Sequence, residues 1–292
     1  MNTKMKDNIK KAMKIVEASK TNIDYIKIVA KMIHDTEILS DKDIMHKENN
    51  EYPTKIFLIE GDTLDGLFLG EKILKSVNKN ERYPHRPLIV NYASYKHPGG
   101  GFLRGASTQE EFLCHHSLLF PVLNAFNDSW YHNHRKDSNG YLFRNEALVT
   151  QNVAFSRNIK NIIEDEPFND IFKSPAVNYA DVLTIAAPKN KDNNTDEKRR
   201  ANNLAFKERI EFMFRCAADL AFYEDNDVFV TGPIGCGVSK QNPKLCASIM
   251  RRLIDEDFKG SFRAIIFTIP DKNSENYKAF KEVFPDAEEI LK

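Results

Sequence analysis

Two adjacent acidic residues, Glu110 and Glu111, follow a run of three glycines, Gly99 to Gly101. A carboxylic acid can give a proton to a leaving oxygen and then, as a carboxylate, activate a water molecule. The two acids stand at the start of a predicted helix, where neighbouring side chains diverge by about 100°, so at most one of them acts directly on a bond. The structural alternative is negative charge that stabilises the N-terminus of that helix.

Two glycine-rich loops could bind an anion. The first is Gly99 to Gly101, and the second carries Gly232, Gly235 and Gly237 between a predicted strand and a predicted helix. Glycine has no side chain, so backbone N–H groups can approach a phosphate closely. The second loop is not a P-loop, because Val238-Ser239 stands where Lys-Ser or Lys-Thr is required, and its spacing also fails the G-x-G-x-x-G fingerprint. Tight turns without a ligand are the alternative.

Histidine and cysteine residues give weaker signals. The pairs His115-His116 and His132-x-His134 have no acidic or cysteine partners at a recognisable zinc-ligand spacing, so no metal is expected. Cys236 lies between two glycines and could be a nucleophile, but no partner base is identifiable. A small apolar residue in a tight loop is therefore the preferred interpretation of Cys236.

Predicted strands and helices alternate along most of the chain, and these elements must position the loops. Apolar runs rich in β-formers predict the strands, and apolar residues at helical spacing predict the helices. The alternation indicates a layered α/β fold with a buried parallel or mixed sheet, in which ligands bind beyond the carboxyl ends of strands. The predicted strands cover residues 55–60, 87–92, 147–155, 180–188, 227–232 and 264–270, and the predicted helices about 64–77, 108–120, 201–223, 243–255 and 274–284.

Residues 1–50 are predicted to be helical throughout and to form an N-terminal extension that packs on a core domain of residues 51–292. Within that domain, Thr108 is a candidate helix N-cap with Glu111 at the capping-box position. The remaining segments read as irregular structure at 124–145, a variable connection at 156–178 and a solvated loop at 189–200.

The composition excludes several classes of protein. The 292 residues contain 42 Lys plus Arg and 42 Asp plus Glu, so the formal net charge is zero. Without a basic field, general binding to nucleic acid or to an anionic membrane is not expected. No apolar run approaches the roughly 20 residues of a bilayer span, and the N-terminus lacks the apolar core of a signal peptide. We therefore expect a cytoplasmic protein, with export as an effector left open.

The segment VNYASYKHPGGGFLRGASTQEEFLCHHSLLFPVL resembles the signature of the bacterial-type (microbial) poly(ADP-ribose) glycohydrolases (PARG), in the macrodomain superfamily. The resemblance rests on three glycines, a seven-residue spacer and Gln109-Glu110-Glu111. TGPIGCGVSKQNP is similar to the second phosphate loop of that family, and IEGDTLDG is similar to the Gly-Asp turn of macrodomains. Over residues 50–285 the resemblance implies a macrodomain-like three-layer fold, with a mixed central sheet between helices.

The resemblance implies an ADP-ribosyl glycohydrolase that cleaves the bond at ribose C1 and releases ADP-ribose from mono- or poly-ADP-ribosylated protein, through an O- or N-linkage and without a cofactor. Glu111 would be the general acid and base, and Glu110 its neighbour that holds the reacting ribose. Asp62 would accept a hydrogen bond from the adenine amino group. A monomer is expected. The implied ADP-ribose-binding residues are Asp62, Thr63, Asn91, Gly99, Gly100, Gly101, Gln109, Gly235, Cys236, Gly237, Val238, Ser239 and Ile269.

The chain also departs from the family pattern. Where the family commonly has Phe after Gly-Cys-Gly-Val, this chain has Ser239, followed by Lys240-Gln241 in place of a Gly-Asn-like pair. The ribose end of the site is therefore expected to differ in shape, which leaves the preference between mono- and poly-ADP-ribose open. Three other functions stay open: a non-catalytic ADP-ribose reader, against which the retained Glu pair speaks, a phosphatase acting on ADP-ribose phosphate, and a structural domain with inert loops.

Overall fold

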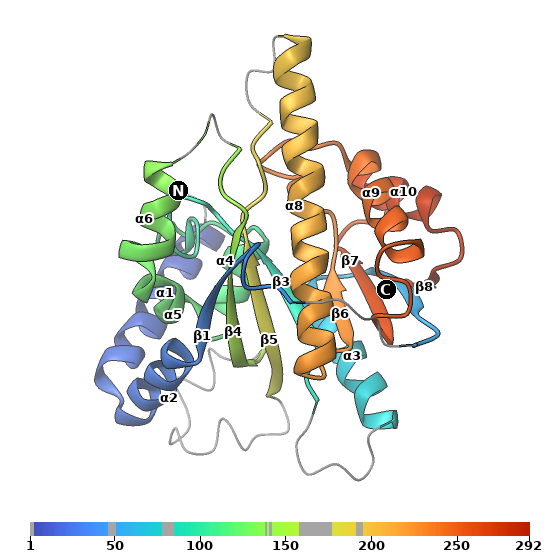
Figure 1. Ribbon diagram of the computed structural model, residues 1–292. Helices are drawn as coiled ribbons and strands as arrows, with labels where there is room; N and C mark the ends of the chain where they lie inside the picture. Colours follow the sequence, from blue (N-terminus) through green and yellow to red (C-terminus); the bar gives the residue numbers. More distant parts are fainter. Residues whose placement is uncertain are drawn as a thin grey trace.

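The computed structural model describes residues 3–45, 51–77, 85–137, 139, 142–157, 177–190 and 195–292. Its centre is an eight-stranded sheet in the order β1-β4-β5-β3-β6-β7-β2-β8 (Figure 1). β4 pairs antiparallel with β1 and with β5, whereas every pair from β5 across to β8 is parallel. The strands are β1 Thr36–Ser40, β2 Lys55–Glu60, β3 Leu88–Tyr92, β4 Glu146–Phe155, β5 Asn178–Ile185, β6 Val228–Thr231, β7 Ala264–Ile269 and β8 Glu288–Ile290.

Helices cover both faces of the sheet and create two hydrophobic cores (Figure 1). One core packs the sheet against α8 (Asp196–Tyr223), α9 (Pro243–Asp255) and α10 (Glu275–Val283). The other packs the opposite face against five helices. These layers confirm the expected α/β fold, because the central strands are apolar on both sides. The five helices are α1 Thr3–Thr21, α2 Ile23–His34, α3 Thr63–Val77, α4 Gln109–His115 and α5 Leu119–Ala125.

The N-terminal segment is helical only in part. α1 and α2 form as expected, but residues 36–40 are a strand, so the prediction of helix there was wrong. β1 pairs along β4 from Thr36 opposite Thr150 to Ser40 opposite Glu146. This pairing gives the backbone groups of β4 partners that an exposed edge would lack. Residues 46–50 lie outside the described residues, and the division of the chain at residue 50 stays a prediction.

The irregular stretch expected at 124–145 contains two short elements, the π-helix η2 (Asn127–Tyr131) and α6 (His132–Lys136). The helix expected at 108–120 is interrupted, because α4 ends at His115 and α5 begins at Leu119. α8 begins at Asp196, five residues earlier than expected, since Thr195 caps it by accepting a hydrogen bond from the Lys198 N–H. Most of the expected connection at 156–178 and part of the expected loop at 189–200 lie outside the described residues.

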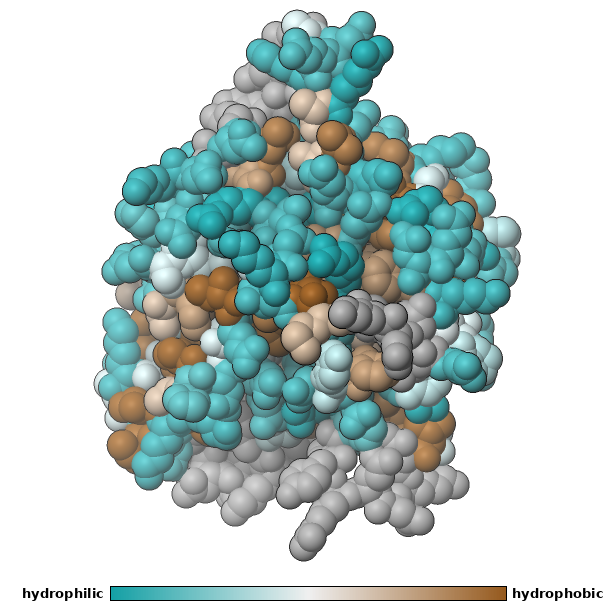
Figure 2. All heavy atoms as spheres, viewed as in Figure 1, coloured by the Kyte–Doolittle hydropathy of each residue, from teal (hydrophilic) through white to brown (hydrophobic). Residues whose placement is uncertain are grey.

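The visible surface is mostly hydrophilic, with hydrophobic residues in small groups (Figure 2). One such group lies over α2, where Ile23 and Ile26 are exposed. None of the helices described has the length and apolar character needed to cross a membrane.

Candidate active site

A cavity of about 560 Å³ opens at the carboxyl ends of β3 and β6. Its walls come from the loop after β3 (residues 92–97), the first glycine loop with Arg104, the start of α4 (residues 108–111), residues 187 and 189, and the second glycine loop (residues 233–239). Segments more than 120 residues apart in the sequence therefore meet at one edge of the sheet. This is the place where parallel α/β sheets bind ligands.

Glu111 is fixed at this cavity by the capping box that the sequence predicts. Its Oε2 accepts hydrogen bonds from the Thr108 N–H, at 2.9 Å, and from the Thr108 hydroxyl. Its Oε1 accepts a hydrogen bond of 2.6 Å from the Gly101 N–H, so the first glycine loop holds the carboxylate from the other side. Glu111 thus has one defined orientation at the cavity wall.

Gly100 lies directly against both carboxyl groups. Gly100 has a φ of +60°, and its neighbour Gly99 has a φ of +62°, so both residues adopt the left-handed conformation. A Cβ at this position would lie 2.3 Å from Glu111 Oε1 and 2.9 Å from Glu110 Oε2. The glycine is therefore required both by the backbone conformation and by the close approach of the acids.

Glu110 also lines the cavity and, like Glu111, is buried. Its side chain is 3 % exposed, and its Oε2 accepts a hydrogen bond of 2.7 Å from the Ser94 N–H. Its Oε1 has no hydrogen-bond partner among the described residues. Burial, and then the nearby charge of Glu111, raise the pKa of Glu110 well above its ordinary value. Burial thus favours a neutral, proton-bearing Glu110 at the cavity.

Two other buried polar groups accompany Glu110. Asn91, at the end of β3, donates from Nδ2 to Thr184 Oγ1 at 3.3 Å, and its Oδ1 has no partner in the described part of the chain. Tyr131 is fully buried on η2, and its pKa is raised first by burial and then by the charge of Glu110. The family resemblance named Asn91, whose contact with the ribose stays a prediction, whereas no sequence pattern pointed to Tyr131 or to its π-helix. Neither residue lines the cavity directly.

Gln109 connects α4 to the sheet. Its Oε1 accepts a hydrogen bond of 2.9 Å from the Tyr92 N–H. Its Nε2 donates to Val90 O at 2.7 Å and to Thr63 Oγ1 at 3.1 Å. Although Gln109 lines the cavity, these three bonds engage its amide within the protein. These bonds fix the start of α4, and with it the two glutamates, relative to β3.

The second glycine loop has the open amides that an anion needs. The N–H groups of Gly237, Val238 and Ser239 donate to no acceptor among the described residues. In the first loop, by contrast, the N–H groups of Gly100 and Gly101 donate to His97 O and to Glu111. The second loop is therefore the better anion nest of the two.

Residues 188–190 tether the second glycine loop. The Asn190 N–H donates to Ser239 O at 2.8 Å, and Gln241 Nε2 donates to Pro188 O at 2.8 Å. Lys189, between these contacts, lines the cavity and brings a positive charge to this wall. Cys236 belongs to the same loop but does not line the cavity.

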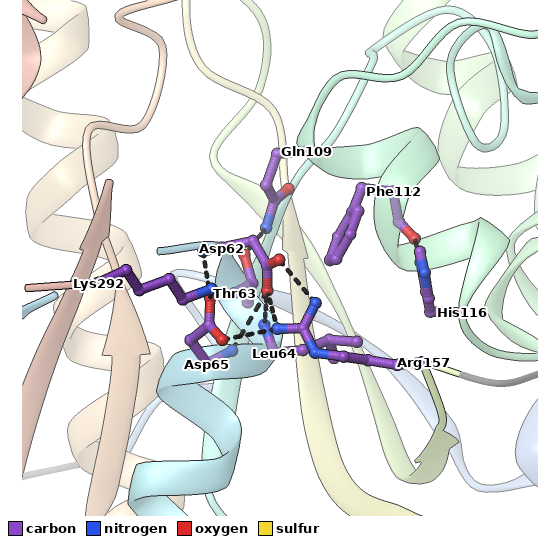
Figure 3. Close-up of polar contacts among 9 residues, drawn as sticks. All are labelled: Asp62, Thr63, Leu64, Asp65, Gln109, Phe112, His116, Arg157 and Lys292. Carbon is purple, nitrogen blue, oxygen red and sulfur yellow. Dashed lines mark hydrogen bonds and ion pairs between the residues drawn. The ribbon is translucent and has the colours of Figure 1, made fainter. Parts of the chain in front are cut away.

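Asp62, expected at the adenine, lies outside the cavity lining and pairs with Arg157 (Figure 3). Arg157 donates from Nη1 to Asp62 Oδ2 at 2.9 Å and from Nη2 to Asp62 Oδ1 at 2.8 Å. Burial acts to raise the pKa of Asp62, but the hydrogen bonds and charge of Arg157 outweigh it and lower that pKa. Sequence reasoning missed Arg157, which is 95 residues away from Asp62 in the chain.

Two further expected contacts are buried. Ile269 is 2 % exposed at the end of β7 and belongs to the core under α10, and Thr63 is 5 % exposed at the start of α3. Neither residue lines the cavity.

No group of three or more His, Cys, Asp or Glu side chains in the described ranges is placed to hold a metal ion. Burial lowers the pKa of both His115 and His116 to about 4, so both are uncharged at neutral pH. Their contacts are structural: His115 packs on the ring of Phe102, and His116 Nδ1 bonds to Phe112 O.

The family model described as the microbial-type PARG catalytic domain matches residues 4–160, more than half of the chain. The chain belongs to this family. The match contains α1, the first glycine loop and both glutamates, whereas the second glycine loop lies beyond it. No curated protein sequence matches this chain.

Solved PARG structures have the same fold. The PARG of Thermomonospora curvata aligns with a TM-score of 0.73 and 22 % identity, over 95 % of this chain and 99 % of that one. The PARG of Deinococcus radiodurans in complex with ADP-ribose aligns with a TM-score of 0.68 and 21 % identity, over 88 % and 97 %. The Thermomonospora curvata enzyme bound to the inhibitor ADP-HPD aligns with a TM-score of 0.70 and 21 % identity, over 94 % of this chain and 98 % of that one. The macrodomain-like PARG fold thus extends over nearly the whole chain.

Proposed function

We propose that this protein hydrolyses the glycosidic bond at ribose C1 of ADP-ribosyl groups and releases ADP-ribose. The observation that carries the proposal is Glu111, held at the cavity by Thr108 and Gly101 in a chain that belongs to the microbial-type PARG family. A reader of ADP-ribose needs the fold and the anion loop, but it needs no oriented carboxylate. The same argument disfavours an inert domain.

The chemistry requires one acid that acts twice. The bond between C1 and the leaving oxygen breaks as Glu111 gives that oxygen a proton, and positive charge develops on the ribose. The oxygen of a water molecule then bonds to C1 while Glu111 takes a proton from it, which restores the acid. Glu110 remains neutral in its buried place, so the site avoids a second negative charge beside the substrate diphosphate.

The diphosphate binds at the second glycine loop in this proposal. The N–H groups of Gly237, Val238 and Ser239 have no acceptor among the described residues, and Lys189 adds a positive charge to the same cavity. The first glycine loop forms part of the cavity wall and holds Glu111. It is not the proposed phosphate site, because the N–H groups of Gly100 and Gly101 already donate to His97 O and to Glu111.

Asp62 retains the capacity to bind the adenine amino group in this proposal. Its Oδ1 already accepts from the Leu64 and Asp65 N–H groups and from Arg157. Its Oδ2 accepts only from Arg157 among the described residues, so one acceptor position of the carboxylate is free. Replacing Asp62 by Ala should therefore reduce the preference for ADP-ribose over its hypoxanthine analogue, which lacks the amino group. Equal binding of both by the wild type would contradict this role.

The test of the function compares the wild type with Glu111→Gln on poly- and mono-ADP-ribosylated proteins. We expect the release of free ADP-ribose to fall by roughly 10²- to 10⁴-fold in the variant, while ADP-ribose binding, measured by calorimetry, changes little. The amide keeps the shape of the side chain but has no acidic proton. Binding without release by the wild type would make the protein a reader, and release of inorganic phosphate from ADP-ribose phosphate would make it a phosphatase.

A further inference from the structure

Two cationic side chains line the cavity without an ion-pair partner among the described residues. Lys96 and Arg104 are exposed and line the cavity beside the first glycine loop. Neither forms an ion pair with any residue that the structure describes, although many surface cations elsewhere are paired. Glu110 and Glu111 line the same cavity, but their hydrogen bonds come from backbone and hydroxyl donors, and neither pairs with Lys96 or Arg104 among the described residues.

Arg104 lies next to the proposed catalytic acid. A Cβ built on Gly101 would lie 4.0 Å from Arg104 Nη2 and 3.4 Å from Glu111 Oε1, so both groups lie close to Gly101. His97 lines the same cavity, and its pKa is lowered by burial and by the charges of Arg104, Arg135 and Lys96. Lys96 and Arg104 therefore both act on this part of the cavity.

An aromatic ring accompanies these charges. Tyr95 lines the cavity and stacks on Phe143, with ring centroids 3.7 Å apart and an angle of 25° between the planes. Lys96 Nζ lies 5.4 Å from the centre of the Tyr95 ring. A flat ring beside cations is the combination that binds a nucleotide, because bases stack on the ring and phosphates pair with the cations.

The tyrosine is held from behind by a strained residue. Phe143 has a φ of +62°, which is rare and unfavourable for a bulky side chain. The buried Arg209 keeps this loop in place by donating from Nε to Asn145 Oδ1 at 2.8 Å and from Nη2 to Leu142 O at 3.3 Å. Strain of this kind persists only where the surroundings over-determine the conformation. The ring of Tyr95 is thus a rigid surface.

The position of this group defines what it can bind. The proposed diphosphate site, at the second glycine loop with Lys189, lines the same cavity as this group. An ADP-ribose bound there with C1 at Glu111 has its scissile bond near Arg104, because Arg104 and Glu111 both lie close to Gly101. The group that leaves can therefore contact Tyr95, Lys96 and Arg104, which line this cavity.

We propose that Tyr95, Lys96 and Arg104 form a second nucleotide subsite, which binds the adenosine diphosphate part of the leaving group. The inference rests on the proposed hydrolysis and adds the residues that recognise what is released. The adenine of the leaving unit stacks on Tyr95, and its diphosphate pairs with Lys96 and Arg104. Substrates whose leaving group is a further ADP-ribose unit are then favoured over those with an uncharged peptide.

The test measures kcat/KM for two substrates, poly(ADP-ribose) and a mono-ADP-ribosylated peptide without acidic residues. In the double variant Lys96→Ala/Arg104→Ala, we expect the value for the polymer to fall by roughly tenfold more than the value for the peptide. The polymer reaction should also lose part of its salt dependence. Arg104→Lys, which keeps the charge, should retain most of the polymer activity. Lys259→Ala, an exposed lysine outside the cavity lining, is the matched control and should change neither value.

Several outcomes would overturn the subsite. These are an equal loss for both substrates, no loss for either, or a selective loss for a peptide rich in Asp and Glu instead of the polymer. A second measurement separates this failure from failure of the proposed function. Glu111→Gln saturated with ADP-ribose should bind free ADP, and Arg104→Ala in that background should weaken the binding. If the wild type releases nothing from any substrate but ADP still binds in this way, the hydrolysis is wrong and the subsite is supported.

Discussion

At the scale of single residues, Glu110 and Glu111 are both buried and both line the cavity, but they differ in their hydrogen-bond partners. Glu111 accepts hydrogen bonds from two backbone N–H groups and a hydroxyl, whereas one oxygen of Glu110 has no partner among the described residues. Burial disfavours the charged form of a carboxyl group, and it raises the pKa of Glu110 well above its ordinary value.

The buried Glu110 should make stability depend on pH. Its pKa in the folded protein is raised above the ordinary 4.5, so between the two values the folded state binds more protons than the unfolded state. This contribution is fully present below pH 4.5 and is lost as the pH rises toward the folded pKa. Glu110→Gln cannot ionise, so its free energy of unfolding should fall less than that of the wild type between pH 5 and pH 8. Urea denaturation across that range checks this, and parallel curves would contradict it.

At the scale of elements, the first glycine loop and α4 form one unit, because the loop supplies the N–H that holds Glu111 and the helix supplies its capping box. Gly100 makes this contact possible by leaving room for both acids. The second glycine loop has a different character, since Gly237 has open space where a Cβ would lie. The two loops should therefore respond differently to the same substitution.

Gly100→Ala should lose activity and stability together. The new Cβ would clash with both carboxyl groups, and displacing a catalytic acid by about 1 Å lowers the rate roughly 100-fold. The left-handed backbone adds about 1–2 kcal/mol of strain. Gly237→Ala is the control for stability and should change the free energy of unfolding by less than about 0.5 kcal/mol. Rate measurements together with thermal or urea denaturation of the two variants check this, and a fully active Gly100→Ala would refute it.

At the scale of the whole molecule, the N-terminal helices support the active site from outside. α1 packs against η1 (Phe102–Arg104), the short 3₁₀ helix that continues the first glycine loop. Asn8 Nδ2 donates to Gly105 O at 3.2 Å, directly after η1. Ile15 of α1 is fully buried in the core that also contains Phe102 and Leu113 of α4. A change in α1 can therefore reach Glu111 through packed neighbours.

Ile15→Ala should destabilise the whole protein. Removing a fully buried isoleucine side chain costs about 2–5 kcal/mol through lost burial and the cavity left behind. Met13→Ala, on the same helix but 64 % exposed, is the matched control and should change stability by less than about 0.5 kcal/mol. Denaturant unfolding of both variants checks the difference. Similar stability of the two would mean that α1 does not share the core that carries the site.

The local features of this protein follow from short stretches of its sequence. The apolar runs placed the central strands, and Thr108 with Glu111 defined the start of α4. Such features depend on residues within a few positions of each other, so they can be predicted from spacing. The glycine loops and the glutamate pair were also found in this way, because parallel strands bring their carboxyl ends to one edge.

The environment of each residue depends on contacts between distant parts of the chain, which short sequence patterns do not reveal. The pairing of residues 36–40 with β4 replaced the expected helix, since a free sheet edge offers backbone partners that local pattern does not reveal. Burial of Glu110 beside Tyr131 and the pairing of Asp62 with Arg157 join residues 21 and 95 positions apart. Whether a side chain is buried or meets an opposite charge from a distant part of the chain depends on how the helices pack on the sheet. A sequence pattern can therefore name the acids, but the fold decides which groups each of them contacts.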